Sequence, residues 1–282
     1  MNLAWTFLFV GCVDPAPSES PSPSGVDRIT VAGSTALVPL ATEAANRFMS
    51  AHPDVAVEIS AGGSLEGLDR VAAGEVDIGT SDVEAPAELA GRLEDHRVAV
   101  VAIAAMAHAG PNLDGVSSLT RAQAKGIFTG RIRNWSEVGG GDMPILVVNR
   151  PPTSGTRAAF RSIVLGDEEF TEGIVRDSSG QVASTTLERP GAIAYLALSY
   201  RTDGLRILAY DGVEPTPDEI RAGRYRIWSY EHLYVRPGAR AHVRAFIDSL
   251  LVEAFQRDTV PRFGFLPVLD APDRSAGAGA ER

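Results

Sequence analysis

Cysteine and lysine are almost absent from this sequence. Cys12 is the single cysteine among 282 residues, so no disulfide can form within the chain and no cysteine-based zinc site is possible. Lysine occurs once, at Lys125, and arginine supplies the remaining basic residues. No glycine-rich run precedes that lysine, which excludes a Walker-type nucleotide loop. The sequence also has no Gly-x-Ser-x-Gly motif, so serine hydrolysis has no support.

Positive charge is scarce as well. The chain has 26 basic and 36 acidic residues and a formal net charge of -10, so attraction to the phosphate backbone of DNA or RNA is not expected. The histidines show neither an i, i+4 pair nor a carboxylate at metal-site spacing, and we expect no metal and no cofactor. They are His52, His96, His108, His232 and His242. Hydrophobic residues form 44% of the chain and charged residues 22%, the composition of an ordinary globular protein.

No hydrophobic run is long enough to cross a bilayer, which takes about 20 apolar residues. The apolar stretch Leu3–Val10 is short and leads into Gly11 and Cys12. The letters FVGC resemble a bacterial lipobox, where signal cleavage leaves a lipidated cysteine. We therefore expect a signal peptide over residues 1–11, lipidation of Cys12, and a proline- and serine-rich tether over residues 12–25. The alternative is a frayed N-terminus with an incidental cysteine, because residues 1–11 contain no lysine or arginine.

Strand-like and helix-like patterns alternate from Arg28 onward, which is typical of an α/β protein with a largely parallel sheet. The expected strands are Arg28–Ala32, Val55–Ile59, Val76–Ile78, Val98–Ala107 and Ile145–Val148. The expected helices are Leu37–Phe48, Ser64–Ala73, Thr120–Phe128, a segment from Thr156 to about Leu165, and Val243–Phe255. Residues 271–282 are rich in alanine, glycine and charge, and we expect them to form a disordered tail.

Four of the predicted strands lead into loops of small, hydroxyl-bearing residues. These loops include Gly-Ser-Thr at 33–35, Gly-Gly-Ser at 62–64 and Gly-Thr-Ser-Asp at 79–82. A later strand leads into Arg150, with Ser-Gly-Thr at 154–156 opening the next helix. Open α/β sheets bind their ligands at the carboxyl ends of strands. We therefore expect one ligand site built from these loops.

The residue types in these loops suit a small tetrahedral oxyanion that is taken out of water. Enclosing such a charge is costly, so each of its oxygens needs a hydrogen-bond donor. Backbone N–H groups at helix starts, short hydroxyls and a bidentate arginine are efficient donors. Taken singly, each loop is more often a helix N-cap, and Arg150 or Asp82 alone would usually have a structural role. Their combination predicts an oxyanion site.

The order of these motifs resembles the phosphate-binding proteins of the high-affinity phosphate ABC importer, a family of the periplasmic-binding-protein class. The resemblance spans most of residues 28–200 and is carried by residues 29–36 (ITVAGSTA), 76–82 (VDIGTSD), 119–135 (LT, Q, IFTG and NW in order), Arg150 with 154–156, and 190–195 (PGAIAY). Two departures occur: Ala194 stands where the family usually has glycine, and Leu65 with Glu66 replaces small residues after Ser64. Neither removes a proposed ligand.

The resemblance implies a two-lobed, type II periplasmic-binding-protein fold with the ligand in the cleft between the lobes. Lobe one would comprise residues 26–103 and 228–270, and lobe two residues 104–227, with the strands Val98–Ala107 and Tyr225–Val235 crossing between them. Bound anion would bridge both lobes and favour the closed form. The implied phosphate contacts, with Ser34 as a possible addition, are Thr35, the Ala36 N–H, Ser64, Asp82, Arg150, Ser154, the Gly155 N–H and Thr156.

Asp82 is expected to set the selectivity of the site. An ionised carboxylate only accepts hydrogen bonds, so it repels an anion that brings no proton. Phosphate keeps at least one proton near neutral pH, whereas sulfate has none. Leaving a buried polar group unpaired can reject an analogue by about 10⁴-fold. Asp82 therefore favours phosphate over sulfate.

Together these features predict an extracytoplasmic receptor, anchored to a membrane only by its lipid. It would bind inorganic phosphate as a monomer, pass it to the permease and ATPase components of an ABC importer, and catalyse no reaction. Two alternatives of the same class stay open: a receptor for another tetrahedral oxyanion, and a phosphate sensor without a transport role. An enzyme that processes phosphate esters would need a nucleophile and metal ligands, which the sequence does not show.

Overall fold

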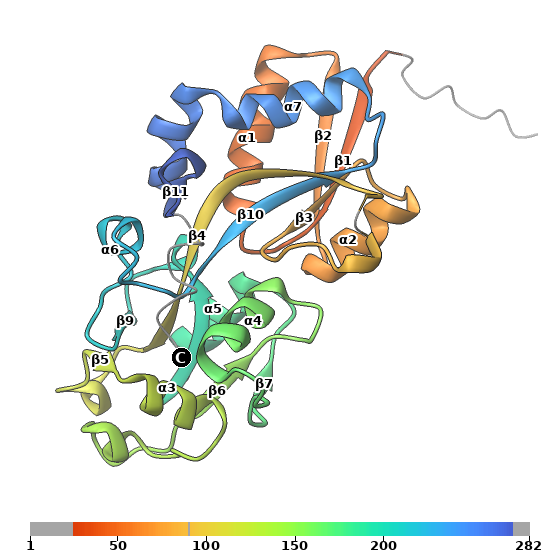
Figure 1. Cartoon of the computed structure of the whole chain (residues 1–282). Helices are drawn as coiled ribbons and strands as arrows, with labels where there is room; N and C mark the ends of the chain where they lie inside the picture. The colour runs from red at the N-terminus through yellow and green to blue at the C-terminus, as the bar shows by residue number, and fades with distance from the viewer. Residues whose placement is uncertain (1–24, 90, 273–282) are drawn as a thin grey trace, which may run out of the picture.

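The computed structural model describes residues 25–89 and 91–272. The predicted signal peptide, Cys12, the tether up to residue 24 and the tail from residue 273 lie outside the described residues. Within the described ranges, no helix is both long enough and apolar enough to span a bilayer. The chain forms two α/β lobes joined by two long strands, β4 (Glu94–His108) and β10 (Trp228–Val235) (Figure 1).

Lobe one contains a sheet in the order β2-β1-β3-β10-β4, with β11 paired to β4. The remaining strands are β1 (Asp27–Gly33), β2 (Val55–Ala61), β3 (Ile78–Ser81) and β11 (Phe265–Pro267). The helices are α1 (Val38–Ala51), α2 (Ser64–Ala73) and α7 (Ala241–Leu251). Alternate residues of β1 face opposite sides: Ile29 and Val31 pack in the core with α1 and α7, while Ala32 packs with α2. The sheet is therefore covered on both faces.

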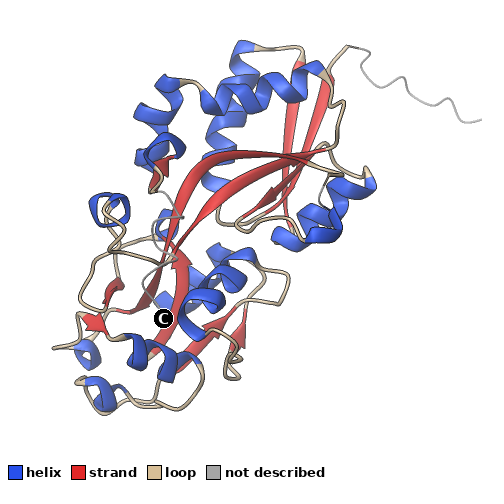
Figure 2. Cartoon of the chain, viewed as in Figure 1, coloured by secondary structure: helices blue, strands red, loops and turns tan. Residues whose placement is uncertain are grey.

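Lobe two contains the far half of β4, with β9 on one side and β8, β6 and β7 on the other (Figure 2). Its strands are β5 (Ser118–Leu119), β6 (Leu146–Asn149), β7 (Ile174–Val175), β8 (Ala192–Ala197) and β9 (Leu205–Tyr210). Its helices are α3 (Arg121–Phe128), α4 (Gly155–Phe160), α5 (Ser179–Glu188) and α6 (Pro217–Arg221). Four aromatic rings pack together in its core: Phe128, Phe160, Phe170 and Tyr195.

The predicted α/β class and two-lobed fold are confirmed, but the sheet is mixed rather than largely parallel. Both crossing strands run antiparallel to their partners. The strand predicted from Val76 begins only at Ile78, because Asp77 uses its side chain to accept the N–H of Thr30. The helix predicted to reach Phe255 ends at Leu251, where Val252 turns to an extended conformation. The helix after Ser154 continues beyond α4 as one π-helical turn, residues 161–165.

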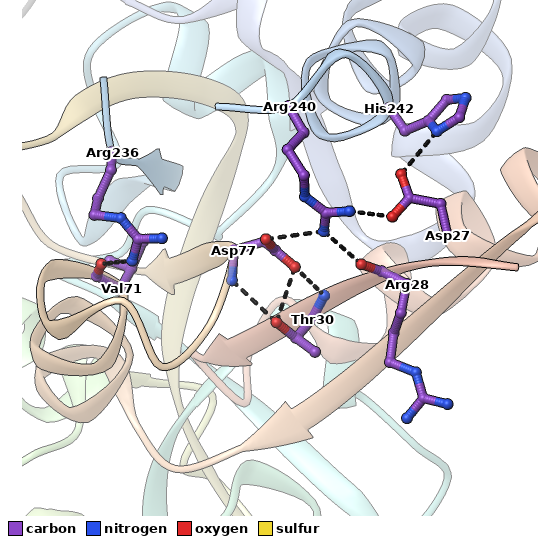
Figure 3. Close-up of polar contacts among 8 residues, drawn as sticks. All are labelled: Asp27, Arg28, Thr30, Val71, Asp77, Arg236, Arg240 and His242. Carbon is purple, nitrogen blue, oxygen red and sulfur yellow. Dashed lines mark hydrogen bonds and ion pairs between the residues drawn. The ribbon is translucent and has the colours of Figure 1, made fainter. Parts of the chain in front are cut away.

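A network of charged side chains ties the start of β1 to β3 and α7 (Figure 3). Arg240 donates to Asp27, to the Arg28 carbonyl and, at 3.0 Å, to Asp77. The other oxygen of Asp27 lies 2.9 Å from Nδ1 of His242. Hydrogen bonding to His242 is the main effect that lowers the pKa of Asp27, and Arg240 lowers it further. The network therefore favours the ionised form of Asp27 in the folded chain.

Replacing Asp27 with Asn should remove part of the stability at neutral pH only. Since the pKa of Asp27 is lowered by folding, its contribution is present above the unfolded value of 3.8 and is lost as the pH falls through the lowered pKa. We expect D27N to reduce the free energy of unfolding by about 0.5–1 kcal/mol near pH 7. Urea unfolding should show this difference shrinking toward pH 3.

The matched control is E58Q. It breaks the exposed pair between Glu58 on β2 and Arg28, the neighbour of Asp27 on β1. An exposed ion pair of this kind contributes little, so E58Q should unfold like the wild type. If D27N lowered the free energy of unfolding by the same amount at every pH, the charge of Asp27 would not be what stabilises the start of β1.

Candidate functional site

Asp82 lies just after β3, at the junction of the two lobes, and is 1% exposed. Its carboxylate accepts hydrogen bonds from the hydroxyl of Ser34 in lobe one and from that of Thr156 in lobe two. The Asp82 N–H donates to Ser64 Oγ at 3.0 Å, and its carbonyl accepts from Ser229 on β10 at 2.5 Å. Three of the loops predicted from the sequence thus meet at one carboxylate.

The first loop is positioned by a close approach of β1 to β3. Gly33 has φ +135°, and a Cβ at this position would lie 2.2 Å from the Thr80 carbonyl oxygen. Only glycine can therefore end β1 this close to its neighbour. Ser34 follows, and its Oγ also accepts the N–H groups of Ala36 at 3.1 Å and Leu37 at 3.3 Å. Ser34 therefore links the start of α1 to the carboxylate of Asp82.

The second and fourth loops contact each other across the junction. Ser154 caps α4 with its side chain, and Gly155 begins the helix. A Cβ on Gly155 would lie 2.2 Å from Ser64 Oγ, which begins α2 in the other lobe. Beside this contact, the N–H of Leu65 donates to the Thr153 carbonyl at 3.1 Å. The two lobes are thus in direct contact around the predicted ligands.

Arg150 follows β6 and is 2% exposed. Its Nη1 donates to Ser179 Oγ and its Nη2 to the Asp177 carbonyl, both at 3.1 Å. Its Nε has no hydrogen-bond partner within residues 25–89 and 91–272. Burial lowers the pKa of Arg150, while the charge of Asp82 raises it. Arginine stays charged because its pKa is so high, so a buried cation acts on the buried carboxyl group of Asp82.

Ser179 is a polar residue of this site that the sequence analysis missed. It begins α5 and is fully buried. Its Oγ lies 2.9 Å from Thr35 Oγ1, and its N–H donates to the same Thr35 oxygen at 3.1 Å. Ser179 therefore connects Thr35 in lobe one to Arg150 in lobe two. A signal was present, because Ser178, Ser179 and Gly180 repeat the pattern of hydroxyls and glycine at a helix start.

Two ionisable residues beside the site were also missed. The hydroxyl of Tyr200 donates to the Thr35 carbonyl at 2.7 Å, and burial raises the pKa of Tyr200 to about 12. Glu231 lies on β10 and is fully buried. Burial and, after it, the nearby charge of Asp82 raise the pKa of Glu231 well above its usual range. Neither residue belongs to a motif, and only the path of the chain brings them here.

The residues predicted from the sequence therefore converge at one place. Ser34, Ser64 and Thr156 form hydrogen bonds with Asp82. Thr35 and Arg150 both form hydrogen bonds with Ser179, which connects them. A cavity of about 350 Å³ lies elsewhere, and its lining includes Leu198 and Leu266 but none of the predicted ligands. Hydroxyls, backbone N–H groups and one guanidinium around a proton-accepting carboxylate can enclose a small oxyanion that carries a proton.

Comparisons with known proteins agree with this chemistry. The sequence model of the PBP superfamily domain matches residues 18–253. The phosphate-binding protein PstS of Bacillus subtilis strain 168 is 42% identical over 261 residues, which cover 90% of this chain and 86% of that protein. The phosphate-binding protein PstS of Borreliella burgdorferi is 26% identical over 262 residues, which cover 85% of this chain and 90% of that protein.

Solved structures resemble the chain over most of its length. A Clostridium perfringens protein, crystallised with bound phosphate, has a TM-score of 0.80 and 33% identity, covering 86% of this chain and all of that one. An ABC-type phosphate transport receptor from Vibrio cholerae has a TM-score of 0.69 and covers 84% of this chain and 99% of that one; at 24% identity it supports the fold alone. The chain therefore belongs to the PBP superfamily, within the family of the PstS phosphate-binding proteins.

Proposed function

We propose that this protein is an extracytoplasmic receptor that encloses inorganic phosphate between its two lobes and delivers it to an ABC importer. The observation that carries the proposal is that the carboxyl group of Asp82 and the guanidinium of Arg150, both at most 2% exposed, are buried at a junction lined by hydroxyls from both lobes. The relatives named for phosphate binding and the Clostridium perfringens structure with bound phosphate support it.

Lobe one (residues 26–103 and 228–270) and lobe two (104–227) would both contribute ligands to the anion. The lobe-one ligands are Thr35, the Ala36 N–H, Ser64 and Asp82, with Ser34 as a possible addition, and the lobe-two ligands are Arg150, Ser154, the Gly155 N–H and Thr156. Several of these donors are engaged with protein partners in this structure: the Ala36 N–H donates to Ser34, and Thr156 donates to Asp82. Phosphate would replace such partners, so its affinity is a difference between two sets of hydrogen bonds.

Asp82 would determine which oxyanion is accepted. Its carboxylate cannot donate, so the bound anion must bring a proton to it. Phosphate and arsenate can do so near neutral pH, and sulfate cannot. This requirement favours phosphate over the alternative of a receptor for a fully deprotonated oxyanion. A phosphate sensor without a transport role would use the same site. Only the proteins that it binds would distinguish it from a transport receptor.

Delivery would depend on the movement of the lobes about β4 and β10. An anion held by both lobes stabilises the closed form, because its affinity for the two forms differs. We infer that the permease and ATPase components of the importer recognise that form. The signal peptide over residues 1–11, the lipid on Cys12 and the tether over 12–25 would keep a monomeric receptor at the membrane surface.

The first test is calorimetric titration of the wild type and of D82N with phosphate, arsenate, sulfate and molybdate. The wild type should bind phosphate and arsenate and give no heat with sulfate. D82N offers an amide that can donate to sulfate, so we expect the phosphate-to-sulfate preference to fall by about 100-fold or more, while phosphate affinity changes less. Wild type that fails to bind phosphate contradicts the function, and D82N with unchanged discrimination contradicts the role of the proton.

Replacing Arg150 with Ala should lower phosphate affinity by at least about 100-fold, because the enclosed anion loses its only positive partner among the proposed ligands. The same calorimetric titration measures the loss. R224A is the matched control: Arg224 is exposed and pairs with Glu219 on the surface, so this variant should bind like the wild type. Normal phosphate binding by R150A would place the site elsewhere.

Replacing Gly155 with Ala should weaken binding by preventing close contact between the lobes. The added methyl group would lie 2.2 Å from Ser64 Oγ, and relieving such a clash costs about 1–3 kcal/mol, or roughly fivefold to 150-fold in affinity. G180A is the control, since its methyl group meets only a Tyr200 ring carbon at 3.7 Å. If G155A and G180A bind phosphate equally well, the contact between α2 and α4 is not required for binding.

A further inference from the structure

Glu231 is a fully buried acidic residue of β10. Its side chain lies on the same face of the strand as that of Ser229, which contacts the proposed anion site. Ser229, two residues earlier, donates to the Asp82 carbonyl. Alternate residues of a strand point to the same side, and the register of β10 shifts only after Glu231. On β4, the residue paired with Glu231 is Ala99, which offers no charge. Glu231 therefore lies on the face of β10 from which Ser229 contacts Asp82.

As an ionised carboxylate, Glu231 would be unpaired. Neither of its oxygens has a hydrogen-bond donor among the described residues. Two ionised carboxylates only accept, so Glu231 and Asp82 could not bond to each other. A proton on Glu231 changes this, because a protonated carboxyl group can donate to Asp82, which acts on Glu231 in the same interior. The protonated form thus satisfies a buried group that the ionised form leaves without a partner.

Several charged and titratable groups surround Glu231 in the part of the chain that the structure describes. They are Asp82 after β3, Arg150 after β6 and Tyr200 after β8, which act on one another together with Glu231. Asp177 and Tyr195 act on Arg150 as well. On β10 itself, the next residue, His232, pairs with Asp95 at 2.7 Å. Two ionised carboxylates beside the Arg150 guanidinium would give these three groups a net negative charge before any anion enters. Repulsion of that kind disfavours ionisation of one of the two acids.

We propose that Glu231 carries a proton when the receptor takes up its anion, and that its hydrogen bond to Asp82 holds Asp82 ionised and oriented as the proton acceptor for that anion. This inference rests on the proposed function of the site. Glu231 is a positioning residue, since it acts through Asp82. A carboxylate has about four acceptor positions. Ser34 occupies one, Thr156 occupies another until the anion replaces it, and Glu231 would occupy a third, which leaves at least one for the proton of the anion.

The proton on Glu231 has a signature in folding that does not involve phosphate. In the unfolded chain Glu231 ionises near pH 4.5, whereas in the folded chain it keeps its proton to higher pH. Stability from this group is therefore full below the unfolded pKa and is lost as the pH rises through the raised pKa. Glutamine cannot ionise, so E231Q lacks this dependence.

The test compares the unfolding of the wild type and E231Q, without phosphate, from about pH 5 to pH 8. We expect the folding equilibrium constant of the wild type to fall by about tenfold per pH unit relative to E231Q, until Glu231 ionises in the folded state. E94Q is the control: Glu94 is a partly exposed residue of β4 that pairs with Arg244, and its difference from the wild type should not vary with pH in this range. A pH-independent difference for E231Q overturns the proposal.

The link to Asp82 is tested by phosphate titration at neutral pH. E231A removes the donor, and we expect its phosphate affinity to be at least tenfold below that of the wild type, with E231Q recovering most of the loss.

Infrared spectra of the wild type should also show the C=O stretch of a protonated carboxyl group that is absent from E231Q. This measurement can be made even if E231A does not fold. Equal affinity of E231A and wild type, or no such band, contradicts the proposal. Failure of the wild type to bind phosphate would contradict the proposed function instead.

Discussion

The arrangement of this protein depends on one buried carboxylate at the junction of two lobes. Asp82 is held from lobe one through Ser34 and Ser64, from lobe two through Thr156, and from the crossing strand β10 through Ser229. A buried charge is tolerated only when hydrogen bonds and an opposite charge compensate for lost hydration. Arg150 and the surrounding hydroxyls supply that compensation, so Asp82 can be buried at this junction only among a matched set of polar groups.

The same constraint explains why the site is made of small residues. Gly33 allows β1 to lie against β3, and Gly155 allows α4 to reach α2. A side chain at either position would meet a backbone oxygen or a serine hydroxyl at 2.2 Å. Short hydroxyls then reach Asp82 directly, without the conformational freedom of long side chains. In the proposed site, selectivity would depend on whether the anion brings a proton for Asp82 to accept. No positively charged surface is needed for this, which is consistent with the net charge of -10.

The two crossing strands connect recognition to shape. β4 and β10 pair with each other and continue the sheet of lobe one toward lobe two. Because β10 carries Ser229, which donates to the backbone carbonyl of Asp82, the strand that joins the lobes also contacts the residue proposed to set selectivity. In the proposed function, a change of hydrogen bonding at Asp82 would therefore reach a strand that joins the lobes. Recognition of the anion and closure of the lobes would then involve the same strand.

Local sequence determined much of this protein. Hydrophobic periodicity located most strands and helices, and the pattern of glycine and hydroxyl residues after strands identified the loops that meet at Asp82, because strand ends and helix starts are set by neighbouring residues. The ends of elements were predicted less accurately. The apolar spacing continues to Phe255, but α7 ends at Leu251. Only the tertiary structure decided that the sheet is mixed, and that Ser179, Tyr200 and Glu231 join the site. Ser179 had a local signal in the hydroxyls and glycine at the start of its helix. The roles of Tyr200 and Glu231 depend on strand pairing and on burial between lobes, which bring together residues far apart in the chain and which no local pattern encodes.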